Sequence, residues 1–483
     1  MSTPSQRLSD IPVRVDHRAS PSPRQGRWAR RVEAFAFRHR DALGWVHVAM
    51  FAGFLALMVV PLLLPLPGDR ATFFNNFTLF ANFVIWGLWF PLVFVSVIFT
   101  GRAWCGVLCP LGASSEWANR VGLKRPVPRW VSWRGTPIVS FVVITVLAQT
   151  VGARDYAAGL AEVFGLAFVC AIALGLVYGR GRNKRAWCRH MCPIGLMLGV
   201  FSRLGAVQFA PKRPLARDDA YTEKGVCPTM IDINRKTESR HCIECFRCVN
   251  PQARGGLKLV LRKPGEEVAN IRRHNANAAE VWFLFLATGL SLGGFLWMIL
   301  PQYQWLRQSV GIWAIDHGWD WIGTPGPGWL MVVHPAAREV FTWLDFFMIV
   351  GFMLACALAL TALLSALTAA ASRLSGRLGG DGSARQRFVE LAYAYMPVAM
   401  VSLIIGLGGK LFDALTLAGV SASAVSDIKL ALFALSIAWS VALNRRLLGV
   451  QGLAGGRRWA ASLPNLAGIA FVALAWWPAI FGL

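Results

Sequence analysis

The segment RAWCGVLCPLG, residues 102–112, occurs a second time as RAWCRHMCPIG, residues 185–195. The two copies start 83 residues apart and are identical at seven of eleven positions, so both read Arg-Ala-Trp-Cys-x-x-x-Cys-Pro-x-Gly. Each copy follows a pair of long apolar segments. The order of two spans followed by one cysteine pair thus occurs twice in the same orientation. This order predicts a parallel membrane repeat with a pseudo-twofold axis along the membrane normal.

Apolar residues make up 55% of the 483-residue chain, more than a soluble domain contains. A stretch of about 20 apolar residues is long enough to cross a bilayer as a helix. We therefore predict an all-α polytopic membrane protein with about nine transmembrane helices. The predicted spans are 43–66, 78–100, 135–152, 160–178, 279–301, 340–371, 388–409, 427–444 and 463–482.

The net charge of +24 is distributed unevenly between the two sides of this topology. With the N-terminus inside, the loops on the inner side carry 43 of the 49 Lys and Arg residues. The loop 179–278 is too long to count under the positive-inside rule. Without it, the inner loops still carry 23 Lys and Arg residues, against 6 on or near the outer side. The N-terminus is thus predicted to be cytoplasmic and the C-terminus outside. No RNP-like or helix–turn–helix pattern accompanies the charges, so the expected contact is a lipid bilayer and not nucleic acid.

The spans and the loops between them divide the chain into four segments. Residues 1–42 are polar and basic, and we predict a disordered cytoplasmic N-terminus. Residues 43–204 form a four-helix membrane unit with the two cysteine repeats, and 205–278 form a small cytoplasmic insert. Residues 279–483 form a five-helix membrane domain to which the sequence assigns no role.

The ten cysteines fall into two groups. Cys170 and Cys356 lie inside predicted spans, where a thiol behaves as a small apolar side chain. The other eight fall in 101–134 or 179–278, on the predicted cytoplasmic side. Because the cytosol is reducing, stable disulfides are disfavoured there, and clustered cysteines indicate metal binding or redox chemistry.

The insert contains HCIECFRCVNP, which places Cys242, Cys245 and Cys248 in a CxxCxxC pattern. Three thiolates at this spacing bind three corners of a cubane 4Fe–4S cluster, and a remote Cys-Pro pair supplies the fourth ligand. Cys227-Pro228 provides that pair, fifteen residues before Cys242. Structural zinc is the competing interpretation, but zinc usually takes two CxxC or CxxH hooks. We therefore predict one 4Fe–4S cluster in a ferredoxin-like insert.

The repeat supplies the other four cysteines, Cys105, Cys109, Cys188 and Cys192. Two dithiol pairs related by a twofold axis present four sulfurs to one centre, and a second iron–sulfur cluster at the membrane surface is the preferred occupant. A dithiol–disulfide relay or a copper site also remains open, since soft thiolates suit copper(I). The Arg and Trp before each pair suit the membrane interface, and the Pro after it would kink or restart a helix.

These motifs resemble those of the membrane polyferredoxins. Two CxxxCP motifs after membrane hairpins, followed by CP…CxxCxxC, are similar over about 43–278 to the NapH, NosR and FixG/CcoG types of that family. The resemblance implies electron transfer at a bacterial inner membrane, in respiratory or metal-centre assembly systems. Family members often carry eight ferredoxin cysteines where this chain has four, and neither a flavin domain nor an immunoglobulin-like tail is recognisable.

The ionisable residues in and near the spans are the candidates for a haem or a proton site. Haem b needs His within the spans, but His47 sits at the inner edge of the first and His334 lies outside the sixth, so no haem is expected, and no flavin. Asp345 lies early in the sixth span. It is a candidate quinone or proton site, or a partner of Arg338 seven residues earlier.

The sequence thus predicts an inner-membrane iron–sulfur electron-transfer protein, a component of an oxidoreductase system. Electrons would pass between the insert cluster, the repeat centre and a quinone or a membrane or periplasmic oxidoreductase partner. The alternative function is an assembly factor that reduces or delivers copper through the CxxxCP thiols for a respiratory oxidase or reductase. Copper bound by these pairs beside an intact insert cluster would favour the alternative.

Overall fold

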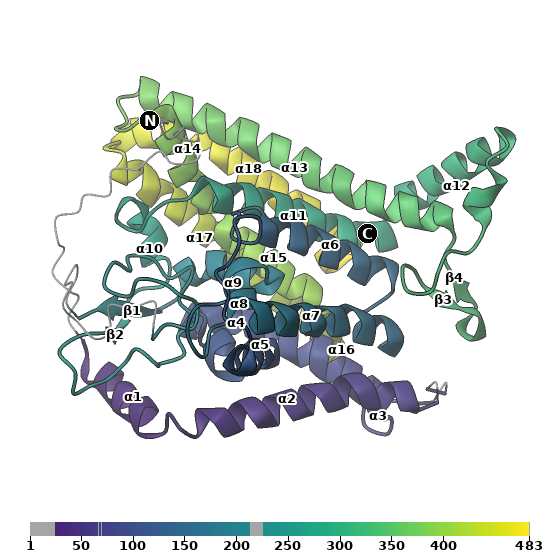
Figure 1. Ribbon diagram of the computed structural model, residues 1–483. Helices are drawn as coiled ribbons and strands as arrows, with labels where there is room; N and C mark the ends of the chain where they lie inside the picture. The colour runs from purple at the N-terminus through teal and green to yellow at the C-terminus, as the bar shows by residue number, and fades with distance from the viewer. Residues whose placement is uncertain (1–24, 66, 69, 213–225, 483) are drawn as a thin grey trace, which may run out of the picture.

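The computed structural model describes residues 25–65, 67–68, 70–212 and 226–482, which are mostly helical (Figure 1). Eight helices there are long and apolar enough to cross a membrane, which confirms the all-α polytopic fold. The eight spans are α2–η1 (Leu43–Val59, Val60–Leu63), α3–η2–α4 (Phe77–Asn82, Phe83–Trp89, Phe90–Thr100), α7 (Ala157–Val177), α11 (Ala278–Ile299), α13 (Trp343–Arg377), α14–η8–α15 (Ala384–Ala392, Tyr393–Tyr395, Met396–Leu407), α17 (Ala422–Val450) and α18 (Gly455–Phe481).

The third predicted span, 135–152, is shorter in the structure. It forms α6 (Thr136–Thr150), whose 15 residues rise about 22 Å, less than the roughly 30 Å of a bilayer's hydrocarbon core. Gly135 and Val151 flank the helix as its caps, and Gly152 turns the chain with a positive φ of 62°. The described residues therefore contain eight spans where about nine are predicted, with α6 as a shorter apolar helix.

Each cysteine repeat forms a short helical turn followed by a second helix. The first copy comprises η3 (Trp104–Leu108) and α5 (Pro110–Val121). The second comprises α8 (Ala186–His190), α9 (Pro193–Phe201) and η4 (Ser202–Leu204). Both copies come directly after a span, α4 for the first and α7 for the second, so they lie at the same end of the bundle (Figure 1).

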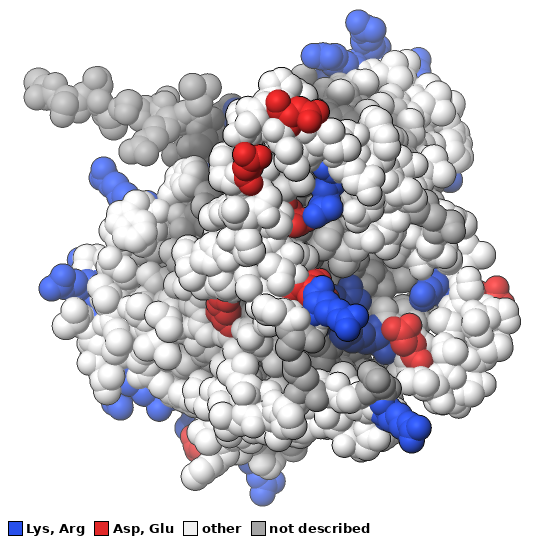
Figure 2. Space-filling view, turned by 90° about the vertical axis from the view of Figure 1, so that its right-hand side faces the viewer, with Lys and Arg blue, Asp and Glu red and all other residues white. Residues whose placement is uncertain are grey.

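The two ends of the helix bundle carry different elements (Figure 1). At the repeat end lie α1 (Arg27–Arg38), β1 (Val207–Pro211), β2 (Leu257–Leu261), α10 (Glu266–Ala269) and η5 (Ile271–Arg273). At the opposite end lie α12 (Pro301–Asp316), η6 (Asp320–Gly323), β3 (Val333–His334), η7 (Pro335–Ala337) and β4 (Glu339–Val340). Figure 2 looks onto the α12 end and shows charged side chains scattered over a mostly uncharged surface.

The insert is built on a two-stranded antiparallel sheet in which β1 pairs with β2 along its full length. Helix α1 packs beside this sheet, where the buried carboxylate of Glu33 accepts a hydrogen bond from the backbone N–H of Leu259. Residues 27–38 are therefore helical and packed, which corrects the predicted disorder of 1–42 for that part. The remainder of that prediction, over 1–24, lies outside the described residues.

A buried cluster of charges joins the insert to the membrane helices. The guanidinium group of Arg203 donates to Glu280 of α11 at 2.8 Å and to Glu267 of α10 at 2.9 Å. Arg240, two residues before the CxxCxxC motif, also donates to Glu280 at 2.9 Å, and so does the hydroxyl of Tyr393 at 2.7 Å. Because a buried charge that loses its partner costs several kcal/mol, this cluster fixes the insert against α11 and η8.

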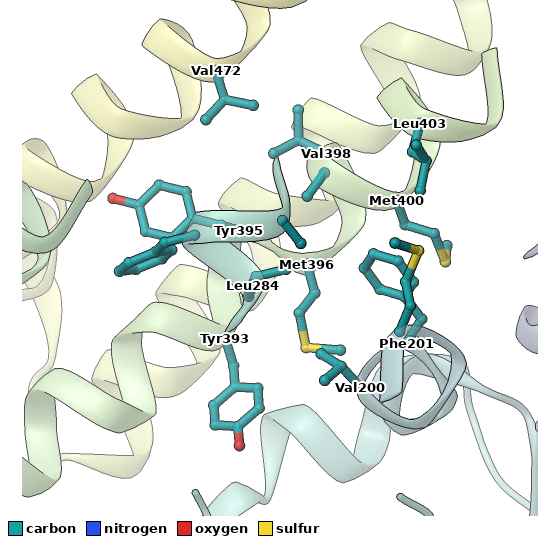
Figure 3. Packing of buried hydrophobic residues seen from close by; sticks show 14 of the residues in the cluster. Val200, Phe201, Leu284, Tyr393, Tyr395, Met396, Val398, Met400, Leu403 and Val472 are labelled. Carbon is teal, nitrogen blue, oxygen red and sulfur yellow. The ribbon is translucent and has the colours of Figure 1, made fainter. Parts of the chain in front are cut away.

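The N-terminal and C-terminal halves share one hydrophobic core. Figure 3 shows Val200 and Phe201 of α9 beside Met396 and Leu403 of α15. In the C-terminal half, α16 (Gly409–Leu417) connects α15 to α17. The helices after residue 278 are therefore packed directly onto the repeat unit.

Candidate metal centres

The two cysteine pairs of the repeat line a single cavity of about 230 Å³. Cys105 and Cys109 reach it from the first copy, and Cys188 and Cys192 reach it from the second. The structure therefore brings together the four sulfurs that the sequence groups by their repeated spacing.

The same local structure presents both pairs. Cys109 is the N-cap of α5 and Cys192 is the N-cap of α9. A proline occupies the first position of each helix, where its fixed φ suits the helix and its missing N–H is not needed. The backbone N–H of Gly112 donates to Sγ of Cys109 at 3.4 Å, and that of Gly195 donates to Sγ of Cys192 at 3.2 Å. The positive end of each helix thus faces a sulfur and favours its thiolate form.

The two copies interlock through arginine and glycine. A Cβ on Gly112 of the first copy would lie 2.8 Å from Nη1 of Arg185 in the second. A Cβ on Gly195 of the second copy would lie 3.2 Å from Nη2 of Arg102 in the first. Each repeat arginine thus packs against the glycine of the other copy, as the pseudo-twofold relation predicts. Both arginines are buried, at 2% and 0% exposure, which corrects the expectation that they lie at the membrane interface.

Arg185 connects the two groups of cysteines electrostatically. Its guanidinium group donates to the backbone carbonyl of Cys105 at 2.8 Å and pairs with Glu116 of α5 at 2.9 Å. Glu116 also pairs with Arg247, which lies inside the CxxCxxC motif. Sequence reasoning missed Glu116 and Arg247. The available signal was that Glu116 is the only charged residue in 103–119.

Burial changes the chemistry of the repeat thiols. Burial raises the pKa of Cys109 to about 11 and that of Cys192 to about 12, so the free thiols are protonated at neutral pH. A bound metal supplies the positive charge that deprotonates such thiols. Four thiols that line one cavity, with one of each pair at a helix N-terminus, are a donor set that fits an iron–sulfur cluster.

A second, smaller cavity is lined by the four cysteines of the insert, Cys227, Cys242, Cys245 and Cys248. Glu244 and Phe246 flank Cys245 and take positive φ values of 52° and 58°, which wind the motif into a tight loop. The Thr229 hydroxyl lies 3.2 Å from Sγ of Cys227. Among the described residues, no group of three or more Cys, His, Asp or Glu side chains is placed to hold a single metal ion. A cubane cluster instead takes one sulfur at each of its four iron corners.

The two cavities adjoin because the insert packs on both repeat copies. A Cβ on Gly106, in the first copy, would lie 2.8 Å from Cα of Cys245. In the second copy, the backbone N–H of Arg185 donates to the backbone carbonyl of Pro228 at 2.9 Å. The first copy thus contacts the CxxCxxC loop and the second contacts the separate Cys-Pro pair.

The structure gives Asp345 a different partner from the one expected. Asp345 forms a capping box with Thr342 at the start of α13, and its Oδ1 accepts a hydrogen bond from Nε of Arg307 at 2.5 Å. Arg338, the predicted partner, is exposed. Asp345 is not among the residues that line either cysteine cavity.

The sequence matches a family described as a 4Fe–4S binding domain in two segments, residues 82–128 and 163–212. Each segment contains one copy of the cysteine repeat, and neither contains the CxxCxxC motif. The segments similar to a 4Fe–4S binding domain are thus part of a chain with eight helices long and apolar enough to cross a membrane.

Three curated proteins are each similar to about a third of the chain, which confirms its resemblance to the polyferredoxin type. Protein NirI of Paracoccus denitrificans is 28% identical over 184 residues, 34% of this chain and 26% of NirI. Putative electron transport protein YccM of Escherichia coli is 27% identical over 189 residues, 34% of this chain and 52% of YccM. Methylamine utilization ferredoxin-type protein MauN of Methylorubrum extorquens is 24% identical over 151 residues, 28% of this chain and 49% of MauN. The matched part therefore spans only a quarter to a half of these relatives, and no solved structure matches the chain.

Proposed function

We propose that the protein carries electrons between two 4Fe–4S clusters at the cytoplasmic side of a bacterial inner membrane and a quinone or a respiratory oxidoreductase. One cluster is held by Cys227, Cys242, Cys245 and Cys248, and the other by Cys105, Cys109, Cys188 and Cys192. The observation that carries the proposal is that all eight cysteines outside the spans line two adjoining cavities. The excess of Lys and Arg in the loops at the repeat end supports the cytoplasmic location.

Bound clusters supply the one-electron chemistry, and the chain supplies position and charge. The contact between Gly106 and Cys245 sets the two cysteine groups side by side. Arg185 places a buried positive charge beside both groups, and Glu116 holds it there. The family match on the repeat segments supports iron–sulfur over copper as the occupant of the repeat cysteines.

The test is the content of iron and acid-labile sulfide in protein purified without oxygen. We expect about eight iron per chain, falling to about four in Cys105→Ser/Cys188→Ser. The matched control is Cys170→Ser/Cys356→Ser, which removes the two cysteines inside the spans and should keep about eight. About four iron in the wild type and in the repeat variant alike would refute the second cluster. Copper bound by the repeat cysteines in its place would favour the assembly-factor alternative.

A further inference from the structure

The repeat cavity continues beyond the cysteines into the membrane helices. Its lining runs from Phe94 back to Trp86 on α4–η2, and from Phe141 to Gln149 on α6. Eight helical residues rise about 12 Å, so the cavity is elongated along the helix axes. The cysteines lie at one end, since α4 ends at Thr100 just before the first copy.

Aromatic side chains form much of the wall of this inner part. Trp86 stacks on Phe90 with ring centroids 4.9 Å apart and an angle of 15° between the rings. Trp89 meets Trp104 edge to face at 5.3 Å, and Phe54 completes this side. The inner part of the cavity is therefore suited to a flat, apolar ring.

The C-terminal half closes the opposite side. Ser291 of α11 and Leu403 and Leu407 of α15 line the same cavity. The helices after residue 278, to which the sequence assigns no role, thus contribute a wall to the site that the repeat cysteines occupy.

Two indole N–H groups of the wall lack a partner. The indole N–H groups of Trp86 and Trp187 are buried and have no hydrogen-bond acceptor among the residues that the structure describes. Trp187 itself is 1% exposed. A buried N–H without an acceptor is costly, so a ligand that brings an acceptor oxygen into the inner part of the cavity would stabilise the indole of Trp86. By contrast, the side-chain oxygen of Gln149 is already held by the indole N–H of Trp297 at 3.1 Å.

We propose that the inner part of this cavity binds the ring of a lipid-soluble quinone, with a carbonyl oxygen that accepts a hydrogen bond from the indole N–H group of Trp86. The site lies among membrane-spanning helices, has aromatic walls and offers a donor without an acceptor, which together match an apolar ring bearing a carbonyl group. The inference rests on the proposed function and deepens it, because it makes a quinone the redox partner at the repeat centre. It also gives the C-terminal half a role, since α11 and α15 wall the site.

The test is photolabelling of the full-length protein in lipid nanodiscs with a short-chain azidoquinone, followed by mapping of the labelled peptides. We expect label on 83–94 and 141–149, removed by an excess of unlabelled short-chain quinone. Ala167→Trp fills the cavity and should lower this competed labelling at least about tenfold. Ala173→Trp adds the same side chain at an exposed position of the same helix and should leave it unchanged. Trp86→Phe keeps a ring but removes the N–H, and should weaken binding about fivefold, as expected for one hydrogen bond.

Competed labelling that Ala167→Trp and Trp86→Phe both leave at the wild-type level would overturn the quinone site. So would label confined to lipid-exposed helix faces, or a tightly retained phospholipid that quinone does not displace. Iron content measured on the same samples separates the hypothesis of a quinone site from the hypothesis of a second cluster. Full iron without labelling in the cavity rejects the quinone site alone, whereas loss of the repeat iron with labelling intact rejects the second cluster and supports the quinone site.

Discussion

The backbone of Gly106 lies directly against that of Cys245, such that a Cβ on Gly106 would lie 2.8 Å from the Cα atom of Cys245. Gly106 belongs to the first repeat and Cys245 to the insert, so this contact joins the two groups of cysteines. The equivalent position of the second copy is Arg189. The repeat is therefore asymmetric at one position, and only the first copy has room there for the CxxCxxC loop.

Substitution of Gly106 by Val should force the loop away from the repeat. Overpacking at a tight contact costs about 1–3 kcal/mol, and the strain falls on the loop that carries Cys245. We expect faster amide hydrogen exchange over 242–248, with the iron of the repeat cysteines retained. Gly165→Val on α7 is the control, because a Cβ there would meet nothing within 4 Å. Unchanged exchange in Gly106→Val would show that the loop tolerates the side chain.

Arg185→Met should destabilise the protein strongly. The substitution removes the fully buried guanidinium group that pairs with Glu116 at 2.9 Å, so that the buried carboxylate keeps only the more exposed Arg247 and Arg120 as partners. Breaking a buried pair from one side costs about 3–5 kcal/mol, which unfolding in mixed micelles can measure. The control is Arg235→Met, because the Arg235–Asp232 pair is largely exposed at 64% and 40% and should contribute at most about 1 kcal/mol. Similar losses of stability in both variants would mean that the buried pair contributes no more to stability than the exposed pair does.

The grouping of the cysteines was predictable from the sequence because ligand spacing within a motif is a local property. Cys242, Cys245 and Cys248 are separated by fixed short steps, and the duplication relates Cys105 to Cys188. The packing of Arg185 against Gly112 was not predictable, because it depends on how segments more than 70 residues apart meet in space. Nothing in the sequence distinguishes a buried arginine from one at the membrane interface.

The spans were located by hydropathy, but their ends were set by local structure that hydropathy does not register. Helix α6 begins after Gly135 and ends before Val151, so the predicted span of 18 residues contains a helix of 15. The partner of Asp345 was missed for a related reason. Arg307 lies 38 residues earlier, on α12, and only the fold brings that helix to the start of α13, whereas Arg338 was close in sequence.

Asp345→Asn should affect stability and leave the redox chemistry intact. Asp345 accepts hydrogen bonds from Arg307 and from the backbone N–H of Thr342, at 2.5 Å and 2.8 Å. The substitution removes an ion pair at a helix start, which should cost about 1 kcal/mol. Iron content and azidoquinone labelling should equal those of the wild type. Loss of quinol-dependent cluster reduction at unchanged stability would instead support Asp345 as a proton site.

The packing of the insert against the bundle should weaken as the pH falls below about 6.5. Burial lowers the pKa of His274 below its usual 6.5, although the nearby Glu267 carboxylate opposes this shift and the hydrogen bond to the Thr237 carbonyl also opposes it. Arg262 and Arg203, which face the same ring, act in the direction of burial. The unfolded state therefore binds a proton more readily than the folded state does. Stability from the neutral ring is fully present above pH 6.5 and is lost as the pH falls toward the folded pKa.

The expected slope is at most about 1.4 kcal/mol per pH unit, the limit for one proton. Urea midpoints between pH 5 and pH 7 measure this slope, with hydrogen exchange of the insert as the local readout. His274→Asn keeps a side-chain donor for the Thr237 carbonyl but does not titrate, so its midpoint should depend less on pH than that of the wild type. His317→Asn, at an exposed position beyond α12, should keep the wild-type slope. Equal slopes in all three proteins would assign the pH dependence to other groups, such as His241, which faces Arg240 and Arg203 of the same cluster.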